Sequence, residues 1–377
     1  MLKTMKYRLK PTKAQATQLD SQLEECRCLY NHFLAERRDA WEERQESLTY
    51  HKQAITLPAL KAHCADLSLV HSQVLQNVAV RIDLAFKAFF RRCKAGEEPG
   101  YPRFRGHGCY DSMTFPQYGN GCQMTDGLLK LSKVGALRVI HHRPLEGTPK
   151  TCTIRRSSTG KWSVTIACEV DTQPLPATGE AVGIDVGLIS FATLSTGEST
   201  PCPKFLRTDE KDLKRTQRKL SAATKGTSER AKRRKIVARV HERIANRRSN
   251  FAHQESRRIV NQFDVIAIED LSVNQMVHNH CLAKSIQDTA WSQFATCLAY
   301  KAAYAGRQYV AVNPSYTSQD CSGCGHRQKK TLAERVHSCA CCGLTLDRDH
   351  NAALNIKRLG LQSLGLAPRS SGIYAGE

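Results

Sequence analysis

The chain has 377 residues, of which 56 are Lys or Arg and 35 are Asp or Glu, so its formal net charge is +21. A hydrophobic content of 41% and a charged content of 24% are typical of a globular protein and argue against global disorder. No run of about 18 apolar residues occurs, and the start of the sequence lacks a signal-peptide apolar stretch, so we expect neither a membrane span nor secretion. The charge surplus predicts a polyanionic partner, nucleic acid first and an anionic membrane surface second.

The first part of the chain has the pattern of a strand followed by helices. Residues 3–11 alternate basic and apolar positions, which predicts a strand, and Thr12 is placed to cap the helix after it. Apolar residues then recur at helical spacing in three segments: 13–45, around 56–66, and 72–94. From 96 to 179 short alternating runs and turn residues predict a β-rich domain with basic edges.

The third region follows a linker, DTQPLPATGE, and alternates strands with helices. AVGIDVGLISFATLSTGE predicts a β-hairpin, and one more short strand is expected around 198–204. The later expected elements are a helix or helix pair at about 209–262, the strand DVIAIEDL, a helix at 283–305, the strand RQYVAVNP and a final helix in DRDHNAALNIKRLG. Between Lys204 and Arg258 there are 19 basic and 6 acidic residues, a net charge of +13.

Three acids stand beside apolar runs in this βββαβαβα order. Asp185 lies in the first strand, Glu269 ends the fourth, and Asp349 begins the last helix. We expect them to converge at one end of a sheet, where carboxylates repel one another unless cations such as Mg²⁺ or Mn²⁺ separate them. Two such ions suit phosphodiester cleavage. Asp270 and Asp347 are alternative ligands, and any single acid is more often a turn or capping residue.

Sixteen cysteines are present, and most are scattered singly, as expected for small buried side chains in a reducing compartment. Two CxxC pairs, each followed by Gly, are separated by 14 residues and predict a closed S₄ site for a structural Zn²⁺. Its ligands are Cys321, Cys324, Cys339 and Cys342. Cys341 is spare, and His326 and His337 are alternative ligands that fit the symmetry less well.

Taken together, these motifs resemble the TnpB family of insertion-sequence proteins, which is related to type V CRISPR effectors. The resemblance covers nearly the whole chain. It is carried by YRLKPTKAQ, CRCLYNHFLAER, GYPRFRG, GIDVG, IAIEDL, LAKSIQDTAWSQF, YKAAYAGRQYVAVNPSYTSQDCSGCG and CACCGLTLDRDHNAALNI. It implies a RuvC-like nuclease domain of RNase H fold with an inserted zinc ribbon, a β-barrel wedge domain and a helical recognition domain.

The resemblance also implies domain limits and a metal-binding triad. The expected parts are a first wedge strand (1–12), the recognition domain (13–95), the wedge domain (96–179), the nuclease domain (180–316), the zinc ribbon (317–344), the last nuclease helix (345–360) and a flexible tail (361–377). The triad is Asp185, Glu269 and Asp349, because the family's last acid directly precedes xNAA.

The implied function is RNA-guided, Mg²⁺- or Mn²⁺-dependent cleavage of target double-stranded DNA beside a short adjacent motif, on behalf of a transposable element. The guide RNA would come from the element's own end, and the protein would work at the nucleoid in the cytoplasm of a bacterial or archaeal host. One alternative is a DNA transposase, disfavoured because such enzymes order their acids Asp, Asp, Glu. A non-cleaving RNA-guided regulator is disfavoured because no acid is replaced, and a plain zinc-ribbon DNA-binding module leaves the three acids unexplained.

Most base reading would then fall to the guide, so the protein needs many phosphate contacts. Ser72 and Gln76 are one helical turn apart and could present polar groups to base edges, although Ser72 is as well placed to cap a helix. The candidate nucleic-acid contacts are Ser72, Gln76, Arg103, Arg105, Arg233, Arg234, Lys235, Arg247 and Arg248. For any single charge a solvated helix face is the alternative.

Overall fold

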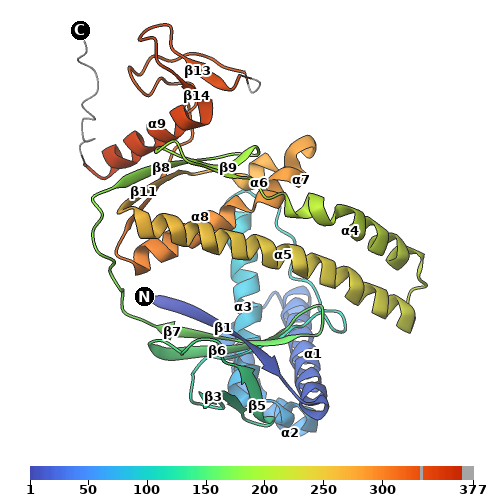
Figure 1. Cartoon of the computed structure of the whole chain (residues 1–377). Helices are drawn as coiled ribbons and strands as arrows, with labels where there is room; N and C mark the ends of the chain where they lie inside the picture. Colours follow the sequence, from blue (N-terminus) through green and yellow to red (C-terminus); the bar gives the residue numbers. More distant parts are fainter. Residues whose placement is uncertain (332–333, 367–377) are drawn as a thin grey trace. The chain divides into compact units, whose positions relative to one another are not determined.

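The computed structural model describes residues 1–331 and 334–366. They form two compact units, Met1–Val170 and the residues from Asp171 onward (Figure 1). Each unit is described by itself.

The first unit is built on a seven-stranded antiparallel sheet in the order β2-β6-β7-β1-β5-β4-β3. Its strands are β1 (Leu2–Lys10), β2 (Ser112–Phe115), β3 (Cys122–Thr125), β4 (Leu128–Leu131), β5 (Gly135–Ile140), β6 (Thr148–Arg156) and β7 (Trp162–Glu169). The alternation predicted for β1 is confirmed, since Met5, Tyr7 and Leu9 are buried and their neighbours are not. Strand pairing among the described residues runs as one series from β2 to β3, so closure into a barrel stays a prediction.

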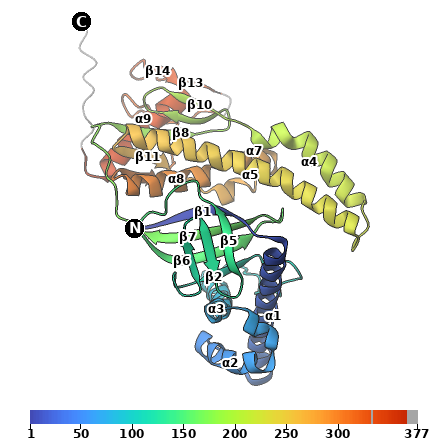
Figure 2. The ribbon, with the colours of Figure 1, turned by 60° about the horizontal axis from the view of Figure 1, so that its bottom comes forward.

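The helices of the first unit lie between β1 and β2 in the chain and gather beside the sheet (Figure 2). They are α1 (Lys13–Arg44), α2 (Tyr50–His63), a short 3₁₀ turn (Ala65–Leu69) and α3 (Ser72–Lys94). The cap predicted for α1 is confirmed, because the Thr12 side chain accepts from the Gln15 amide and the Gln15 side chain accepts from the Thr12 amide. The second helix starts earlier than expected because Thr49 caps it.

The second unit contains a five-stranded sheet in the order β10-β9-β8-β11-β12. The strands are β8 (Ala181–Val186), β9 (Ser190–Leu194), β10 (Ser199–Pro201), β11 (Val265–Glu269) and β12 (Gln308–Val312). Three of them, β8, β11 and β12, run parallel, and β9 and β10 are antiparallel to their neighbours. The expected order of strands and helices is confirmed, and residues 171–180 carry neither helix nor strand, as expected for the linker.

Helices cover both faces of this sheet (Figure 1). On one face α5 (Ser228–Gln262) and α8 (Trp291–Tyr304) pack on a core that includes Ile184, Phe191 and Phe294. On the other face α9 (Arg348–Ser363) packs on Ala267 and Val312 through Ile356. The side chains of the acids expected on β8 and β11 could therefore lie on either the α5–α8 face or the α9 face of the sheet.

Three expected boundaries differ from the structure. The basic segment, expected as a helix or helix pair from about 209, is a helix pair, and its first helix α4 (Phe205–Ala222) begins earlier than expected. The helix expected at 283–305 is two helices, α7 (His280–Thr289) and α8, because Ala290 has the left-handed backbone φ of 56°. The last helix continues past 360 to Ser363, because Leu361 is buried on the unit's core, while residues 367–377 of the expected tail lie outside the described residues.

The α5–α8 contact holds a buried cation. Lys301 is 5% exposed, and its Nζ donates to the Ser256 Oγ at 2.8 Å and to the His253 carbonyl at 2.5 Å. Burial lowers the pKa of Lys301 to about 8, against a raising effect of Cys297. Lys301 therefore links α5 and α8 by hydrogen bonds, and burying its charged form costs desolvation free energy.

No helix in the described part of the chain is both long enough and apolar enough to cross a membrane.

Candidate active site and metal centre

The register of the sheet brings two of the predicted acids together. Strands β8 and β11 pair in parallel up to Ile184 and Ile268, and the next residue on each strand is Asp185 and Glu269. Because side chains alternate, Asp185 shares a face with Gly183, and Glu269 shares a face with Ala267. The element that covers Gly183 and Ala267 therefore marks the face of the sheet on which Asp185 and Glu269 lie.

Helix α9 covers that face at very short range. A Cβ on Gly183 would lie 2.1 Å from the Ala353 carbonyl oxygen and 2.4 Å from the Lys357 amide, and one on Gly360 would lie 2.4 Å from the Ala267 Cβ. Glycine is needed at both positions for the helix to sit this close to the strands. Since Ala353 lies over Gly183, the helical turn before Ala353 holds Asp349, over the end of β8 that carries Asp185.

The helix start separates the roles of Asp347 and Asp349. Asp347 is the N-cap of α9, and its Oδ1 accepts from the amides of Asp349 at 2.9 Å and His350 at 3.2 Å. Asp349 is in the first turn, and its Oδ1 is 3.5 Å from the Arg348 Nε and 4.0 Å from the Arg335 Nη1. The cap gives Asp347 a structural role, and of the two acids Asp349 has the larger effect on the pKa of Asp185.

The three acids act on one another electrostatically. Burial raises the pKa of Asp185 well above its usual range, and the charges of Glu269 and Asp349 raise it further. Burial also raises the pKa of Glu269, against a hydrogen bond from Thr317, and Asp349 adds to the rise. In the described residues the carboxylate oxygens of the three acids are not all within 4.8 Å of one another. Asp270, the alternative to Glu269, is exposed and is not among the charges that shift Asp185.

A neighbouring loop holds Glu269 in place, which the sequence did not indicate. The buried Thr317 hydroxyl donates to the Glu269 Oε1 at 2.6 Å. The Thr317 carbonyl accepts from the Asn355 Nδ2 of α9 at 2.9 Å. The two asparagines at Asn351 and Asn355, one helical turn apart in DHNAALN, are the signal that could have pointed to this contact.

The four paired cysteines come together as predicted. Their sulfurs all lie within 4.8 Å of one another, with Sγ–Sγ distances of 3.6 Å for Cys321–Cys342 and for Cys324–Cys339. A tetrahedron with metal–sulfur bonds of about 2.3 Å requires sulfurs about 3.8 Å apart, so the group has the size of an S₄ metal site. The matching turns are closed by Gly325 N to Cys321 O and Gly343 N to Cys339 O, both 2.9 Å, and both glycines have positive φ.

The neighbouring alternatives do not join this sulfur group. Cys341 is exposed and outside it. His326 and His337 are also outside it, and the His337 Nδ1 contacts the Lys330 Nζ.

The cysteine-bearing segment is attached to α9 by side-chain amides. It contains the short strands β13 (Val336–Ser338) and β14 (Thr345–Asp347), and β14 leads directly into α9. Asn351 donates to the Asp320 carbonyl at 2.8 Å and accepts from the Ser322 amide at 2.9 Å. Asn355 donates to the same carbonyl at 2.7 Å. Both amides are buried, so they link the first CxxC pair to the helix that carries Asp349.

The predicted contacts on the first unit are all exposed. Ser72 and Gln76 lie on the surface of α3; His71, not Ser72, caps that helix, and the Ser72 hydroxyl accepts from the Lys61 Nζ at 2.9 Å. Arg103 and Arg105 lie in the loop before β2. The Arg105 carbonyl accepts from Arg27 and from Asn31, each at 2.9 Å, which fixes the loop on α1.

The predicted contacts on α5 differ from one another. Arg248 has both its Nε and Nη2 on the buried Asp288, and the Arg247 Nη1 is 3.1 Å from Asp209. Arg233 is bonded to Glu229 within its own helix. Arg234 and Lys235 are exposed, and no ion pair ties either of them to another described residue. Among the predicted contacts on α5, Arg234 and Lys235 therefore face solvent without a carboxylate partner in the described part of the chain.

Three family models match the chain. One for the OrfB proteins of IS605, described as "Probable transposase", matches residues 165–280, and one described as "Cas12f1-like, TNB domain" matches residues 291–356. A third, described as "Helix-turn-helix domain", matches residues 1–46, where the structure has β1 and the single helix α1.

Two relatives match over almost the whole length. A protein of Streptomyces pristinaespiralis named "Putative RNA-guided DNA endonuclease" is 38% identical over 95% of this chain and 89% of its own. A protein of Escherichia coli (strain K12) named "Putative RNA-guided DNA endonuclease InsQ" is 31% identical over 95% and 92%.

Two solved structures share the fold at low identity. A chain of the "Cas12f1-sgRNA-target DNA complex" has a TM-score of 0.60 at 16% identity and covers 92% of this chain and 83% of its own. The "mini-RNA-guided endonuclease CRISPR-Cas_phi3" has a TM-score of 0.53 at 8% identity and covers 96% and 92%.

Proposed function

The chain belongs to the TnpB family of insertion-sequence proteins, and on that basis we propose that it cuts DNA phosphodiesters at Asp185, Glu269 and Asp349 under the direction of a guide RNA. It is an RNA-guided DNA endonuclease of an insertion sequence. The observation that carries the proposed site is the convergence of the three acids on the face of the sheet that α9 covers. The second unit then has the RuvC-like RNase H fold, and the first holds the wedge and recognition parts.

The donor set of the site fits divalent cations. The charges of Glu269 and Asp349 raise the pKa of Asp185, the charge of Asp349 raises that of Glu269, and a cation between the acids would remove this repulsion. Asp185 and Asp349 would hold Mg²⁺ or Mn²⁺, with Glu269 completing the pair of ions. Bound there, such ions activate a water and stabilise the leaving oxygen. Thr317 keeps Glu269 oriented by donating to one carboxylate oxygen, which leaves the other free to orient the attacking water.

The four ribbon cysteines fit structural Zn²⁺. An S₄ site has no open position for a substrate, so its contribution is to fold the ribbon. Because Asn351 and Asn355 bind the backbone beside Cys321, a folded ribbon holds α9, and with it Asp349, in position.

The nucleic-acid partners follow from the charge. The segment of net charge +13 covers α4 and most of α5, and this helix pair projects from the sheet of its unit (Figure 1). Arg234 and Lys235 there, and Arg103 in the first unit, are exposed and suited to phosphates of a guide RNA transcribed from the element's end and of target DNA beside a short motif. Such DNA lies in the nucleoid of a bacterial or archaeal host.

The test is to sequence the RNA that co-purifies with the protein and to reconstitute cleavage with it. We expect RNA from the flank of the protein's own gene and Mg²⁺-dependent cutting of a matched DNA. Asp185→Ala should abolish cutting while RNA and DNA binding remain. Undiminished cutting by Asp185→Ala, or random RNA fragments with no guided cleavage, would overturn the proposal and favour a transposase.

A further inference from the structure

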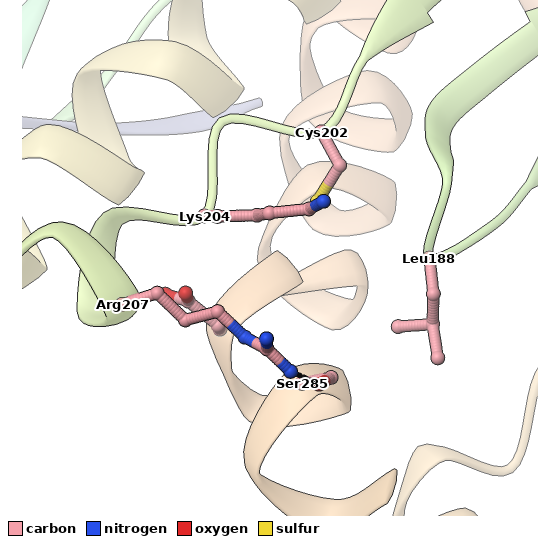
Figure 3. A pocket seen from close by; sticks show the side chains of 6 residues that line it. Leu188, Cys202, Lys204, Arg207 and Ser285 are labelled. Atoms are coloured by element: carbon pink, nitrogen blue, oxygen red, sulfur yellow. Dashed lines mark hydrogen bonds between the residues drawn. The ribbon is translucent and has the colours of Figure 1, made fainter.

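A small cationic pocket lies beyond the end of β8, outside the three acids and the ribbon (Figure 3). Its volume is about 160 Å³. The side chains that line it are Leu188, Cys202, Lys204, Arg207, Ser285 and Asp288. They come from the β8–β9 loop, the segment after β10, the start of α4, and α7.

The one acid of the pocket is already neutralised. Asp288 is 6% exposed and accepts from the Leu206 amide with both oxygens, at 2.9 Å each. Arg248 adds two further donors to Oδ1, at 3.0 and 2.7 Å. The carboxylate thus caps α4 and pairs with a cation from α5, so it has little negative charge left to offer a pocket ligand.

Two basic side chains remain for that ligand. Lys204 and Arg207 are exposed and reach across the pocket from the side opposite Leu188 (Figure 3). The Arg207 Nη2 donates to the Ser285 Oγ at 3.3 Å, which orients the guanidinium while leaving its other N–H groups available. Two cations, a hydroxyl and an apolar wall of this size match one phosphodiester with part of its sugar.

The pocket is tied to the strand that bears Asp185. Leu188 lies in the loop after β8, and the Cys202 amide donates to the Ile189 carbonyl of that loop at 3.4 Å. Leu188 also packs on the core of this sheet. A phosphate in the pocket would therefore be held against the same loop that follows Asp185.

We propose that Lys204 and Arg207 bind a single backbone phosphate of the DNA strand being cut, and thereby position that strand for the three acids. This inference rests on the proposed function. Lys204 and Arg207 are positioning residues, because they hold a phosphate other than the one that reacts. Because this phosphate belongs to the DNA strand being cut, loss of either side chain should affect cleavage far more than guide binding.

The test uses the full chain with its guide RNA and a target strand in which one phosphate at a time is replaced by a neutral methylphosphonate. At one position near the cut, we expect wild-type cleavage to fall about 10- to 100-fold, the range for a charge-assisted hydrogen bond. Arg207→Gln should lose a similar factor on unmodified DNA and lose no more on that modified DNA. Arg207→Lys should restore part of the rate, and Lys329→Gln, an exposed lysine of the ribbon segment, is the charge-matched control expected to cut normally.

If the loss of cleavage rate caused by Arg207→Gln multiplied with the loss caused by the methylphosphonate at every position, the positioning role would be overturned. A target strand on which no position is sensitive would overturn it as well. In both cases wild-type cutting that depends on Asp185 leaves the nuclease proposal intact, whereas cutting that survives Asp185→Ala counts against the nuclease proposal itself. Melting curves of the Arg207 variants identify any loss that comes from unfolding.

Discussion

The buried Thr317 hydroxyl donates a 2.6 Å hydrogen bond to Glu269, so the end of β11 is held by the loop that follows β12. We predict that Thr317→Val lowers the cleavage rate about 10- to 100-fold, as loss of a residue that orients a metal-binding carboxylate does. Thr317→Ser keeps the hydroxyl and should stay within a few-fold of wild type. Single-turnover rates over a Mg²⁺ titration measure this, and equal rates for Val and wild type would show that Glu269 needs no such orientation.

Neighbouring acids at the start of α9 should respond in opposite ways. Asp349→Asn should abolish cutting with unchanged stability, because the N-cap is Asp347. Asp347→Ala should reduce stability by about 1 kcal/mol through loss of the cap, and Asp347→Ser should restore most of it. Cleavage assays and thermal melts on the three variants check this. A loss of cutting in Asp347→Ser at full stability would make Asp347 the metal ligand.

The zinc content of cysteine variants should distinguish the four predicted ligands from the neighbouring Cys341. We expect one Zn²⁺ per chain by elemental analysis, lost in Cys324→Ser and retained in Cys341→Ser. Because the ribbon is bonded to α9 through Asn351 and Asn355, zinc loss should also weaken cleavage although the site is closed. Co²⁺ substitution gives a thiolate absorption band as an independent readout, and full zinc in Cys324→Ser would contradict the ligand set.

The buried lysine between α5 and α8 predicts a rise of stability with pH. The pKa of Lys301 is about 8 in the folded chain against about 10.5 when exposed, so between these values only the unfolded chain keeps the proton. Stability therefore increases as pH rises from about 8 to 10, by at most about 3 kcal/mol. In Lys301→Met this rise should disappear. Denaturant unfolding of both proteins at several pH values tests it, and a pH-independent difference between them would refute the assignment.

Substitutions at two arginines of α5 should have different effects, one on stability and the other on nucleic-acid binding. Arg248→Gln leaves Asp288 buried without its partner and should lower stability by several kcal/mol. Arg234→Gln should leave the free energy of unfolding within about 0.5 kcal/mol of wild type. It should reduce the slope of log binding constant against log salt concentration by about one unit, the value of one phosphate contact. Melting curves and binding titrations at several salt concentrations are the measurements. Identical behaviour of the two variants is the contrary result.

The sequence predicted the strands and helices of the second unit in order because each has a clear apolar pattern. It also predicted the three acids, since they stand at the ends of those patterns. The residues alone left Asp347 open as an alternative to Asp349, because which of the two acids caps α9 depends on how the helix leaves β14. The break at Ala290 was missed because the apolar pattern runs through both helices.

The contacts beyond the acids were harder to predict for a physical reason. Thr317, Asn351 and Asn355 form a chain of hydrogen bonds between segments that meet only in the folded unit. The pairing of Arg248 with Asp288 is likewise long-range, and composition alone could not distinguish this paired arginine from the exposed Arg234.

The docking of α9 on the glycine face of β8 has a consequence for the timing of activity. Asp185 and Glu269 are made before the third acid, which lies on a helix that seats only where Gly183 leaves room for it. A growing polypeptide on the ribosome can thus fold much of its sheet and even collect RNA while it is unable to cut. The order of synthesis therefore delays the complete set of three acids until α9 has been made.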